Sequence, residues 1–187
     1  MEVVVVLANI GTAIGLFPVL RPYGERIALG HLFFRFLECV AITVGIVAIL
    51  SLLTLSQAFV AAAAPDASAF LVAGALLRAV YKWTFALGPL FFLGINTFMY
   101  SSLLYKSRLV PRPLAVWGLA GATLVFASAF LVLFGADQLS TPVVLLAVPI
   151  GIFEMVFAGW LIVKGFNPSA IAAAPAKTGR SEVLSPA

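Results

Sequence analysis

Cysteine and histidine are almost absent from this chain of 187 residues, which contains one of each, Cys39 and His31. A single cysteine cannot form a disulfide within the chain, and it supplies neither a multi-cysteine metal site nor a haem-attachment motif. A single histidine likewise excludes two-histidine haem and zinc sites within one chain. We therefore expect no metal site and no cofactor, and we expect His31, near the end of an apolar run, to be solvated.

Charged residues are also scarce. They make up 10% of the chain, against about 25% in ordinary soluble domains. Hydrophobic residues make up 63%, and the mean hydropathy is +1.16. A soluble core cannot bury that much apolar surface, so the composition indicates an integral membrane protein. The sequence also lacks HExxH, GxSxG and a glycine-rich phosphate loop, so it offers no positive evidence of hydrolase or nucleotide chemistry.

Five apolar runs are each near or above the roughly 20 residues that a helix needs to cross a bilayer. They cover residues 3–20, 29–60, 84–105, 114–135 and 143–163. This pattern predicts an all-α fold, a polytopic transmembrane helix bundle of five spans in one domain, 1–166. Only Glu2 precedes the first run, which therefore lacks the basic region of a signal peptide, and we expect it to be retained as a span.

A further helix is predicted before the third span. The sequence PDAS at 65–68 offers a helix start, with Asp66 or Ser68 as the N-cap, and predicts a helix over about 67–83. This helix either lies on the membrane surface or protrudes before it enters the bilayer. The alternative is one tilted helix that includes the third span, with its basic side chains snorkelling.

The end of the chain differs in character from the apolar runs. Asn167 and Pro168 stop the last helix, because the residue before a proline is pushed out of the helical conformation. The remaining residues are mostly Ala, Pro, Ser and Gly with a few charges. This composition predicts a disordered cytoplasmic tail over 167–187.

Basic residues favour one orientation in the membrane. Three segments hold eight of the eleven bases: Arg21 and Arg26, then Lys106, Arg108 and Arg112, then Lys164, Lys177 and Arg180. The fourth connection, 136–142, carries Asp137 and no base. Under the positive-inside rule this pattern predicts an external N-terminus and a cytoplasmic C-terminus. We expect anionic lipid headgroups, and not nucleic acid, to be the partners of these bases, because they cluster beside the ends of the spans.

Polar residues inside the runs fall at similar depths. With a rise of 1.5 Å per residue, each lies about 9 to 18 Å from the end of its span that we predict as cytoplasmic. The six residues are Asn9, Arg35, Glu38, Asn96, Thr123 and Glu154, and together they come from all five runs. We therefore predict one polar layer near the middle of the bilayer and take these six residues as the candidate binding site.

The charged members of this layer should be paired. A charge at the centre of a membrane helix costs about 2.5 to 3.5 kcal/mol, so it should face the bundle interior. Arg35 and Glu38 are three residues apart and can pair on one helix face. Glu154 has no basic partner of its own, so it must share Arg35, accept hydrogen bonds from the neutral polar residues of the layer, or be protonated.

Small residues and aromatics add weaker signals. Gly11 and Gly15 form a GxxxG pair, and Gly118 with Ala122 and Ala158 offers similar close packing of helices. Aromatic residues near the ends of the runs, predicted to be interfacial anchors, are Trp83, Trp117, Tyr81, Tyr100 and Tyr105. Pro89 and Pro149 lie inside runs and are expected to kink them.

Two functional interpretations stay open. The first is a protein that binds, transports or senses a small ligand or a proton through the polar layer. The second is a non-catalytic structural or partner subunit, in a homo- or hetero-oligomer, whose polar layer only holds helices together, which is the commoner role of such groups. An intramembrane enzyme is the weakest candidate, because no nucleophile or metal set accompanies Glu38 and Glu154.

Several stretches resemble a known family. They are LGHLFFRFLE at 29–38, LLTLSQ at 52–57, LLYKSRLVPR at 103–112, WGL at 117–119, EM at 154–155 and WLIVKGFN at 160–167. This combination is similar to the bacterial membrane-protein family catalogued as domain of unknown function 4386. The resemblance implies a multi-pass protein of the bacterial inner (plasma) membrane, and it brings no established activity.

Two departures from the family pattern carry further expectations. Members usually have six helices, and the helix missing here would precede Met1. If that helix were restored, the N-terminus would move to the cytoplasm while the other spans kept their orientation. Pro113 also stands where the family tends to have an aromatic residue, which affects only the local turn.

Overall fold

The computed structural model describes residues 2–62 and 67–173, and the regular elements within them are helical. In chain order the elements are α1 (Glu2–Leu20), η1 (Arg21–Tyr23), α2 (Glu25–Ala61), α3 (Ala67–Phe85), η2 (Ala86–Phe92), α4 (Leu93–Ser107), α5 (Arg112–Leu133), α6 (Thr141–Val163) and α7 (Pro168–Ala172). Among these described residues, five helical runs are long and apolar enough to cross a membrane. The predicted all-α fold with five spans is confirmed.

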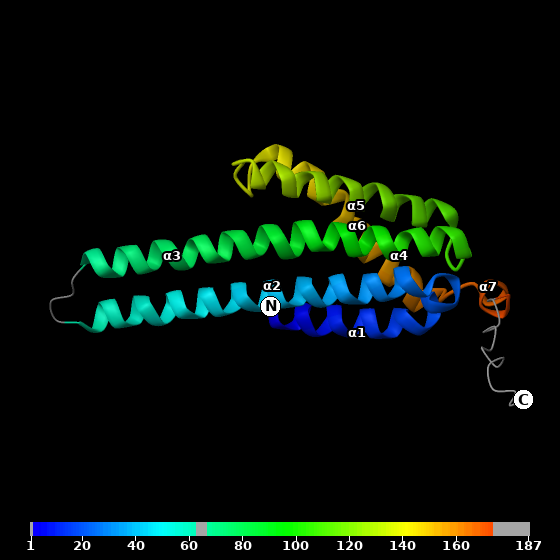
Figure 1. The fold of residues 1–187 in the computed structure, drawn as a ribbon, viewed down its shortest axis with the longest axis horizontal. Coiled ribbons are helices and arrows are strands. Elements are labelled where there is room, and N and C mark those ends of the chain that lie inside the picture. The colour runs from blue at the N-terminus through cyan, green and yellow to red at the C-terminus, as the bar shows by residue number, and fades with distance from the viewer. Residues whose placement is uncertain (1, 63–66, 174–187) are drawn as a thin grey trace, which may run out of the picture.

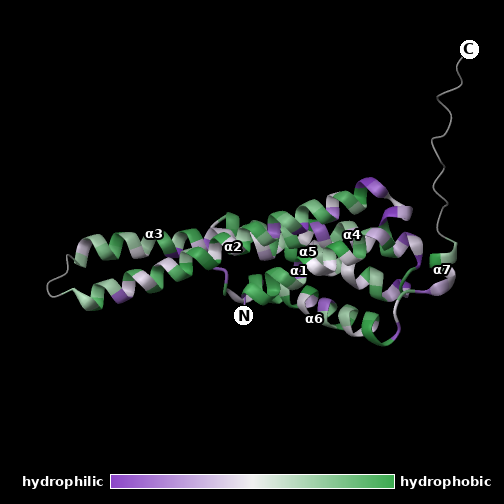
Figure 2. Ribbon diagram, turned by 90° about the horizontal axis from the view of Figure 1, so that it is seen from below, coloured by the Kyte–Doolittle hydropathy of each residue, from purple (hydrophilic) through white to green (hydrophobic). Residues whose placement is uncertain are grey.

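The helices lie roughly along one axis, and α2 is the longest single α-helix among the described residues (Figure 1). Helix α1 packs beside the first half of α2, α4 packs on α2 and α5, and α6 packs on α5. With 37 residues, α2 is about 55 Å long, well beyond the roughly 30 Å of a hydrocarbon core. Its second half pairs with α3, and in both views this pair extends past the ends of α1, α5 and α6 (Figures 1 and 2).

The third candidate span is one helical run from Ala67 to Ser107. The helix predicted from about residue 67 begins at Ala67 and continues through η2 into α4 without a break. Pro89 lies in η2, a π-helical segment. Because proline lacks an N–H and its ring collides with the preceding turn, the wider π-helical turns accommodate it. Asp66, one of the two predicted N-caps, lies outside the described residues.

The disordered tail predicted from residue 167 is wrong for its first seven residues. Asn167 caps α7, because its side chain accepts a hydrogen bond from the Ser169 N–H. The Asn167 N–H also donates to the Leu109 carbonyl at 2.8 Å, and the Tyr23 hydroxyl donates to the Ala170 carbonyl at 2.6 Å. These bonds anchor α7 to the loops at the end of the bundle. Residues 174–187 lie outside the described residues.

Small residues allow close packing on α5 but not on α1. A Cβ added at Gly118 would lie 2.6 Å from Cζ of Phe153 and would also collide with the Ser101 hydroxyl, and Ala122 is fully buried. Cβ atoms added at Gly11 or Gly15 would meet nothing within 4 Å. The predicted GxxxG contact on α1 is therefore not made among the described residues, because both glycines face away from the neighbouring helices.

This difference predicts unequal effects of two identical substitutions. Gly118→Ala forces a methyl group against Ser101 and Phe153, and such overpacking costs about 1 to 3 kcal/mol. We expect a clear loss of apparent Tm in detergent for Gly118→Ala and no loss for Gly15→Ala, which serves as the matched control. Equal Tm values for the two variants would contradict the packing of α5 described above.

Candidate functional site

A buried ionic cluster joins four helices in the interior of the bundle. Its members are Asn9 on α1, Arg35 and Glu38 on α2, Asn96 on α4 and Glu154 on α6. Arg35 and Glu38 are 6% and 3% exposed, and Asn96 is fully buried. The structure thus brings together five of the six residues taken from the sequence.

Glu38 is the most completely bonded member of the ionic cluster. Oε1 accepts hydrogen bonds from the Asn9 amide at 3.1 Å and from Nη1 of Arg35 at 3.2 Å. Oε2 accepts from the same Nη1 at 3.1 Å and from the Asn96 amide at 2.6 Å. All four contacts come from donors, which is the arrangement that an ionised carboxylate requires. Glu38 is therefore fixed in place by donors from three helices, α1, α2 and α4.

Glu154 is bonded far less completely. Oε1 lies 3.6 Å from Nη2 of Arg35, an ion-pair distance beyond hydrogen-bond length, and the side chain is 32% exposed. One guanidinium is therefore shared by two carboxylates that it holds unequally. The sum of formal charges is one positive against two negative, so the ionic cluster carries one uncompensated negative charge when both acids are ionised.

Asn96 is held in place by the segment that contains Pro89. Its amide nitrogen donates one hydrogen to the Phe92 carbonyl at 3.0 Å and the other to Glu38. Phe92 is the last residue of the π-helical segment η2. Both amide hydrogens are thus used, and the Thr97 hydroxyl is 3.5 Å from the Asn96 side-chain oxygen. This bonding fixes which end of the amide faces Glu38.

Thr123 does not join the ionic cluster, and the prediction that all five spans contribute to one polar layer is wrong at α5. The side chain is exposed, and its hydroxyl donates to the Leu119 carbonyl of its own helix at 2.9 Å. The depth of a residue along a helix follows from counting residues, but the direction in which it faces does not. The buried face of α5 runs instead through Gly118, Gly121, Ala122 and Val125.

His31 and Tyr100 form a buried layer beside the ionic cluster that the sequence analysis missed. Both had been expected at the membrane interface, but His31 is fully buried and Tyr100 is 2% exposed. Their rings meet edge to face at 5.1 Å between centroids, and Nδ1 of His31 lies 3.3 Å from the Asn96 carbonyl oxygen. His31, Arg35 and Glu38 recur at positions i, i+4 and i+7, a spacing that could have revealed one shared helix face.

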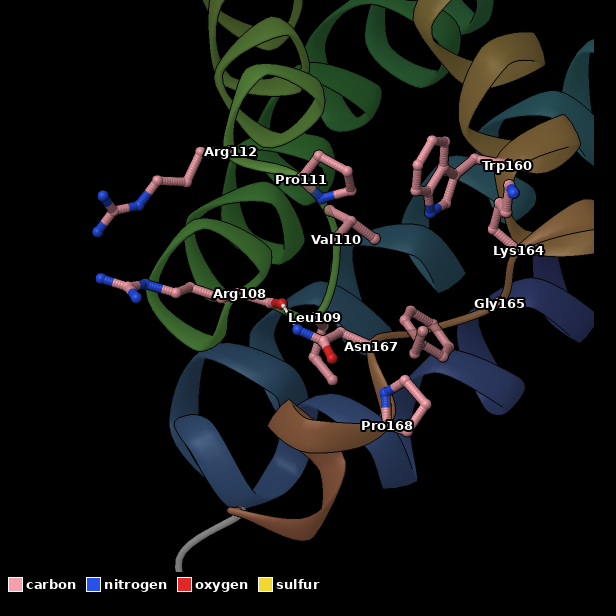
Figure 3. A pocket seen from close by; sticks show the side chains of 11 residues that line it. Arg108, Leu109, Val110, Pro111, Arg112, Trp160, Lys164, Gly165, Asn167 and Pro168 are labelled. Atoms are coloured by element: carbon pink, nitrogen blue, oxygen red, sulfur yellow. Dashed lines mark hydrogen bonds between the residues drawn. The ribbon is translucent and has the colours of Figure 1, made fainter.

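A second site lies at the end of the bundle where α4, α5 and α6 meet their loops. Arg108, Arg112, Trp160 and Lys164 line part of a cavity of about 390 Å³ there. The side chains of Arg108 and Arg112 extend away from Trp160 and Lys164 and do not converge on one point (Figure 3). This arrangement makes a broad cationic rim and not a closed anion-binding pocket.

The ionic cluster has the chemistry of a proton or hydrogen-bonding site. Among residues 2–62 and 67–173, no group of three or more His, Cys, Asp and Glu side chains could hold a metal ion. Cys39 is buried, and its thiol lies 3.8 Å from the Val6 carbonyl oxygen on α1. The cluster contains one carboxylate, Glu154, that can still accept hydrogen bonds, and this carboxylate lies next to the guanidinium that it shares with Glu38.

A family model described as "Domain of unknown function (DUF4386)" matches residues 1–165. The chain matches no curated protein and no solved structure. The match covers α1 to α6 and includes every residue of the ionic cluster.

Because Glu38 and Glu154 share the guanidinium of Arg35, we expect substitutions at Arg35 and Glu38 to have non-additive effects on stability. Arg35→Met leaves Glu38 buried without its cation, which costs about 3 to 5 kcal/mol. Adding Glu38→Met removes the stranded charge, so we expect the double variant to recover much of the stability. Thr123→Val, outside the ionic cluster, is the control and should change nothing. Unfolding by titration with denaturing detergent is measured for the wild type, Arg35→Met, Glu38→Met, the double variant and Thr123→Val, and additive losses for the two single variants would contradict the pairing.

Proposed function

Because the chain belongs to the DUF4386 family, whose description assigns no activity, we propose a function from the ionic cluster: the protein binds an exchangeable proton on Glu154 within the membrane. The observation that carries this proposal is the unequal sharing of Arg35 by two carboxylates. This function is one form of proton binding and sensing through an intramembrane polar layer.

The charge balance favours Glu154 as the proton acceptor. An uncompensated carboxylate in a medium without water is costly, so a cation must accompany it or a proton must neutralise it. Glu38 has no free capacity, since its oxygens already accept four hydrogen bonds. Glu154 makes one long ion pair and is one-third exposed, so a proton can reach it without dismantling the rest of the cluster.

Protonation of Glu154 would weaken the link between α6 and α2. Helix α6 packs on α5 and stacks Phe153 and Phe157 on Tyr100 of α4. Its ion pair with α2 is the Glu154–Arg35 contact. A neutral Glu154 gives up that charge attraction, while Arg35 keeps Glu38 as its partner. The proton thereby sets how firmly α6 is held against α2, which is the physical basis of a sensing or gating step.

The bases at one end of the bundle support an orientation with that end in the cytoplasm of a bacterial inner membrane. Arg21, Arg26, Lys106, Arg112 and Lys164 all lie at the ends of helices that meet there (Figure 1). The cationic rim in Figure 3 faces the same side and suits the phosphates of anionic lipid headgroups. Lipid headgroups exchange with one another and need no enclosed site, so an open cationic rim suits them better than a closed pocket does.

The proposed proton predicts a specific infrared signal. Acidification of the protein in lipid nanodiscs should produce a carboxylic acid C=O band that is absent at higher pH, because a proton adds to Glu154. Glu154→Gln should remove this band, whereas Glu25→Gln should keep it, because Glu25 is an exposed acid paired with Arg21. Persistence of the buried-acid band in Glu154→Gln would refute the assignment.

The orientation predicts opposite labelling of two introduced cysteines. In a Cys39→Ser background, Leu139→Cys places a thiol in the exposed α5–α6 connection, and Lys164→Cys places one at the basic end. A membrane-impermeant maleimide applied to intact cells should label the first and reach the second only after permeabilisation. The reverse pattern would invert the proposed topology and leave the proposed proton site untouched.

A further inference from the structure

A small cavity lies at the end of α1 away from Arg21, where α1, α2, α3 and η2 meet. Its volume is about 180 Å³. This is below the roughly 300 to 1,000 Å³ of sites for drug-sized molecules, so the cavity suits a compact ligand. Its walls include Glu2 from α1, Ile42 from α2, and Tyr81, Thr84 and Phe85 from α3. Among the lining residues Glu2 alone is charged.

Glu2 brings an unpaired negative charge to this cavity. Its Oε1 accepts a hydrogen bond from the Tyr81 hydroxyl at 3.0 Å, while Oε2 accepts none from the described residues. Within residues 2–62 and 67–173, Glu2 forms no ion pair. It lies in the first turn of α1, where the helix dipole favours an ionised carboxylate. The side chain is exposed, so a ligand can reach it from outside the bundle.

The two bases of α3 do not neutralise Glu2. The Nζ atom of Lys82 lies 5.5 Å from the centroid of the Trp83 ring. Arg78 lines a different cavity, beside Leu52 and Phe59. The carboxylate of Glu2 is therefore left to attract a cation from elsewhere.

Two aromatic rings share the cavity with this carboxylate. The rings of Tyr81 and Phe85 have centroids 6.5 Å apart and planes inclined by 42°. The Tyr81 ring is held between Glu2, which accepts its hydroxyl proton, and Gly45, where an added Cβ would lie 3.5 Å from Cδ2 of Tyr81. The face of an aromatic ring attracts a cation within about 6 Å. Carboxylate and rings thus favour the same sign of charge.

The rest of the lining restricts the kind of cation. A metal ion such as Ca²⁺ needs about six to eight oxygen ligands, and the part of the chain that the structure describes holds no group of three metal-binding side chains. The Thr84 hydroxyl donates to carbonyls of its own helix, and Ile42 is apolar. A quaternary ammonium group carries its charge inside an apolar shell, so it can contact such walls without hydrogen bonds.

We propose that the cavity formed by Glu2, Tyr81 and Phe85 binds a compact quaternary ammonium group, with the charge against the carboxylate and the methyl groups against the two rings. Gly45, in the same wall, lies about 29 Å from Arg26 along α2, where the hydrocarbon core ends and headgroups begin. A free cation and the choline headgroup of a lipid both supply this chemistry. None of the three residues belongs to the ionic cluster, so the site goes beyond the proposed proton on Glu154.

Saturation-transfer NMR with tetramethylammonium tests the proposal on the full chain in nanodiscs of phosphatidylglycerol. We expect transfer to the methyl protons of tetramethylammonium but not to those of neopentanol, which has a similar shape and no charge. Glu2→Gln should weaken binding about tenfold, because the amide keeps an acceptor for Tyr81 but lacks the negative charge. Glu25→Gln, the same change at an exposed glutamate paired with Arg21, should bind as the wild type does.

Phe85→Leu tests the aromatic wall, because leucine keeps an apolar side chain but lacks the ring face. We expect binding to weaken about fivefold. Phe70→Leu is the matched control, since this ring of α3 packs on Phe59 outside the cavity. Equal transfer to neopentanol, unchanged binding in Glu2→Gln, or no transfer to tetramethylammonium would each overturn the proposal.

Phosphatidylcholine added to the nanodiscs separates the two sources of the ligand. A lipid headgroup in the site should abolish transfer to tetramethylammonium, whereas a site for a free cation should bind it equally well with and without phosphatidylcholine. Either result supports the quaternary ammonium site and identifies its source. The infrared band of Glu154 is a separate measurement, so failure of this site is distinguishable from failure of the proposed proton.

Discussion

The guanidinium of Arg35, buried where a membrane offers no water, is the constraint on which the rest of the interior depends. A charge in this setting needs a counter-charge, and α2 alone supplies only Glu38. The other partners come from distant parts of the chain: Glu154 contacts Arg35 directly, and Asn9 and Asn96 complete the shell of Glu38. Arg35 and its partner Glu38 together link four helices at one point.

That requirement also explains why an irregular segment sits next to the site. Asn96 can reach Glu38 only if α4 presents the correct face to α2, and the π-helical turns around Pro89 change the rotation of the helix just before it. Gly88 lets the same segment approach α2 closely, since a Cβ there would lie 3.3 Å from the Glu38 carbonyl oxygen. Proline, glycine and asparagine thus act together to bring one amide to one carboxylate.

The sequence predicts well how deep a polar residue lies along its span, but it predicts poorly in which direction the side chain faces. The apolar runs identify the five spans, and counting residues along them places Asn9, Glu38, Asn96 and Glu154 at a common level, where the structure has them. The same count includes Thr123, which faces away from the cluster. In a soluble helix the polar face marks solvent, but a membrane helix is apolar on every side, so periodicity carries little information about facing. His31 shows the converse error, since its nearness to a span end suggested water although it faces the core.

Two polar levels, the basic end of the bundle at Arg26 and a second level near Gly45, lie on either side of the ionic cluster along α2. At the second level Tyr81 donates to Glu2, Gln138 donates to the Lys82 carbonyl, and Gly45 packs against Tyr81. From Arg26 to Gly45 is about 29 Å along α2, close to the roughly 30 Å of a hydrocarbon core. Glu38 lies about 18 Å from Arg26 on that scale, well inside both limits. Because Glu154 contacts Arg35 on this stretch of α2, the whole ionic cluster lies between the two polar levels.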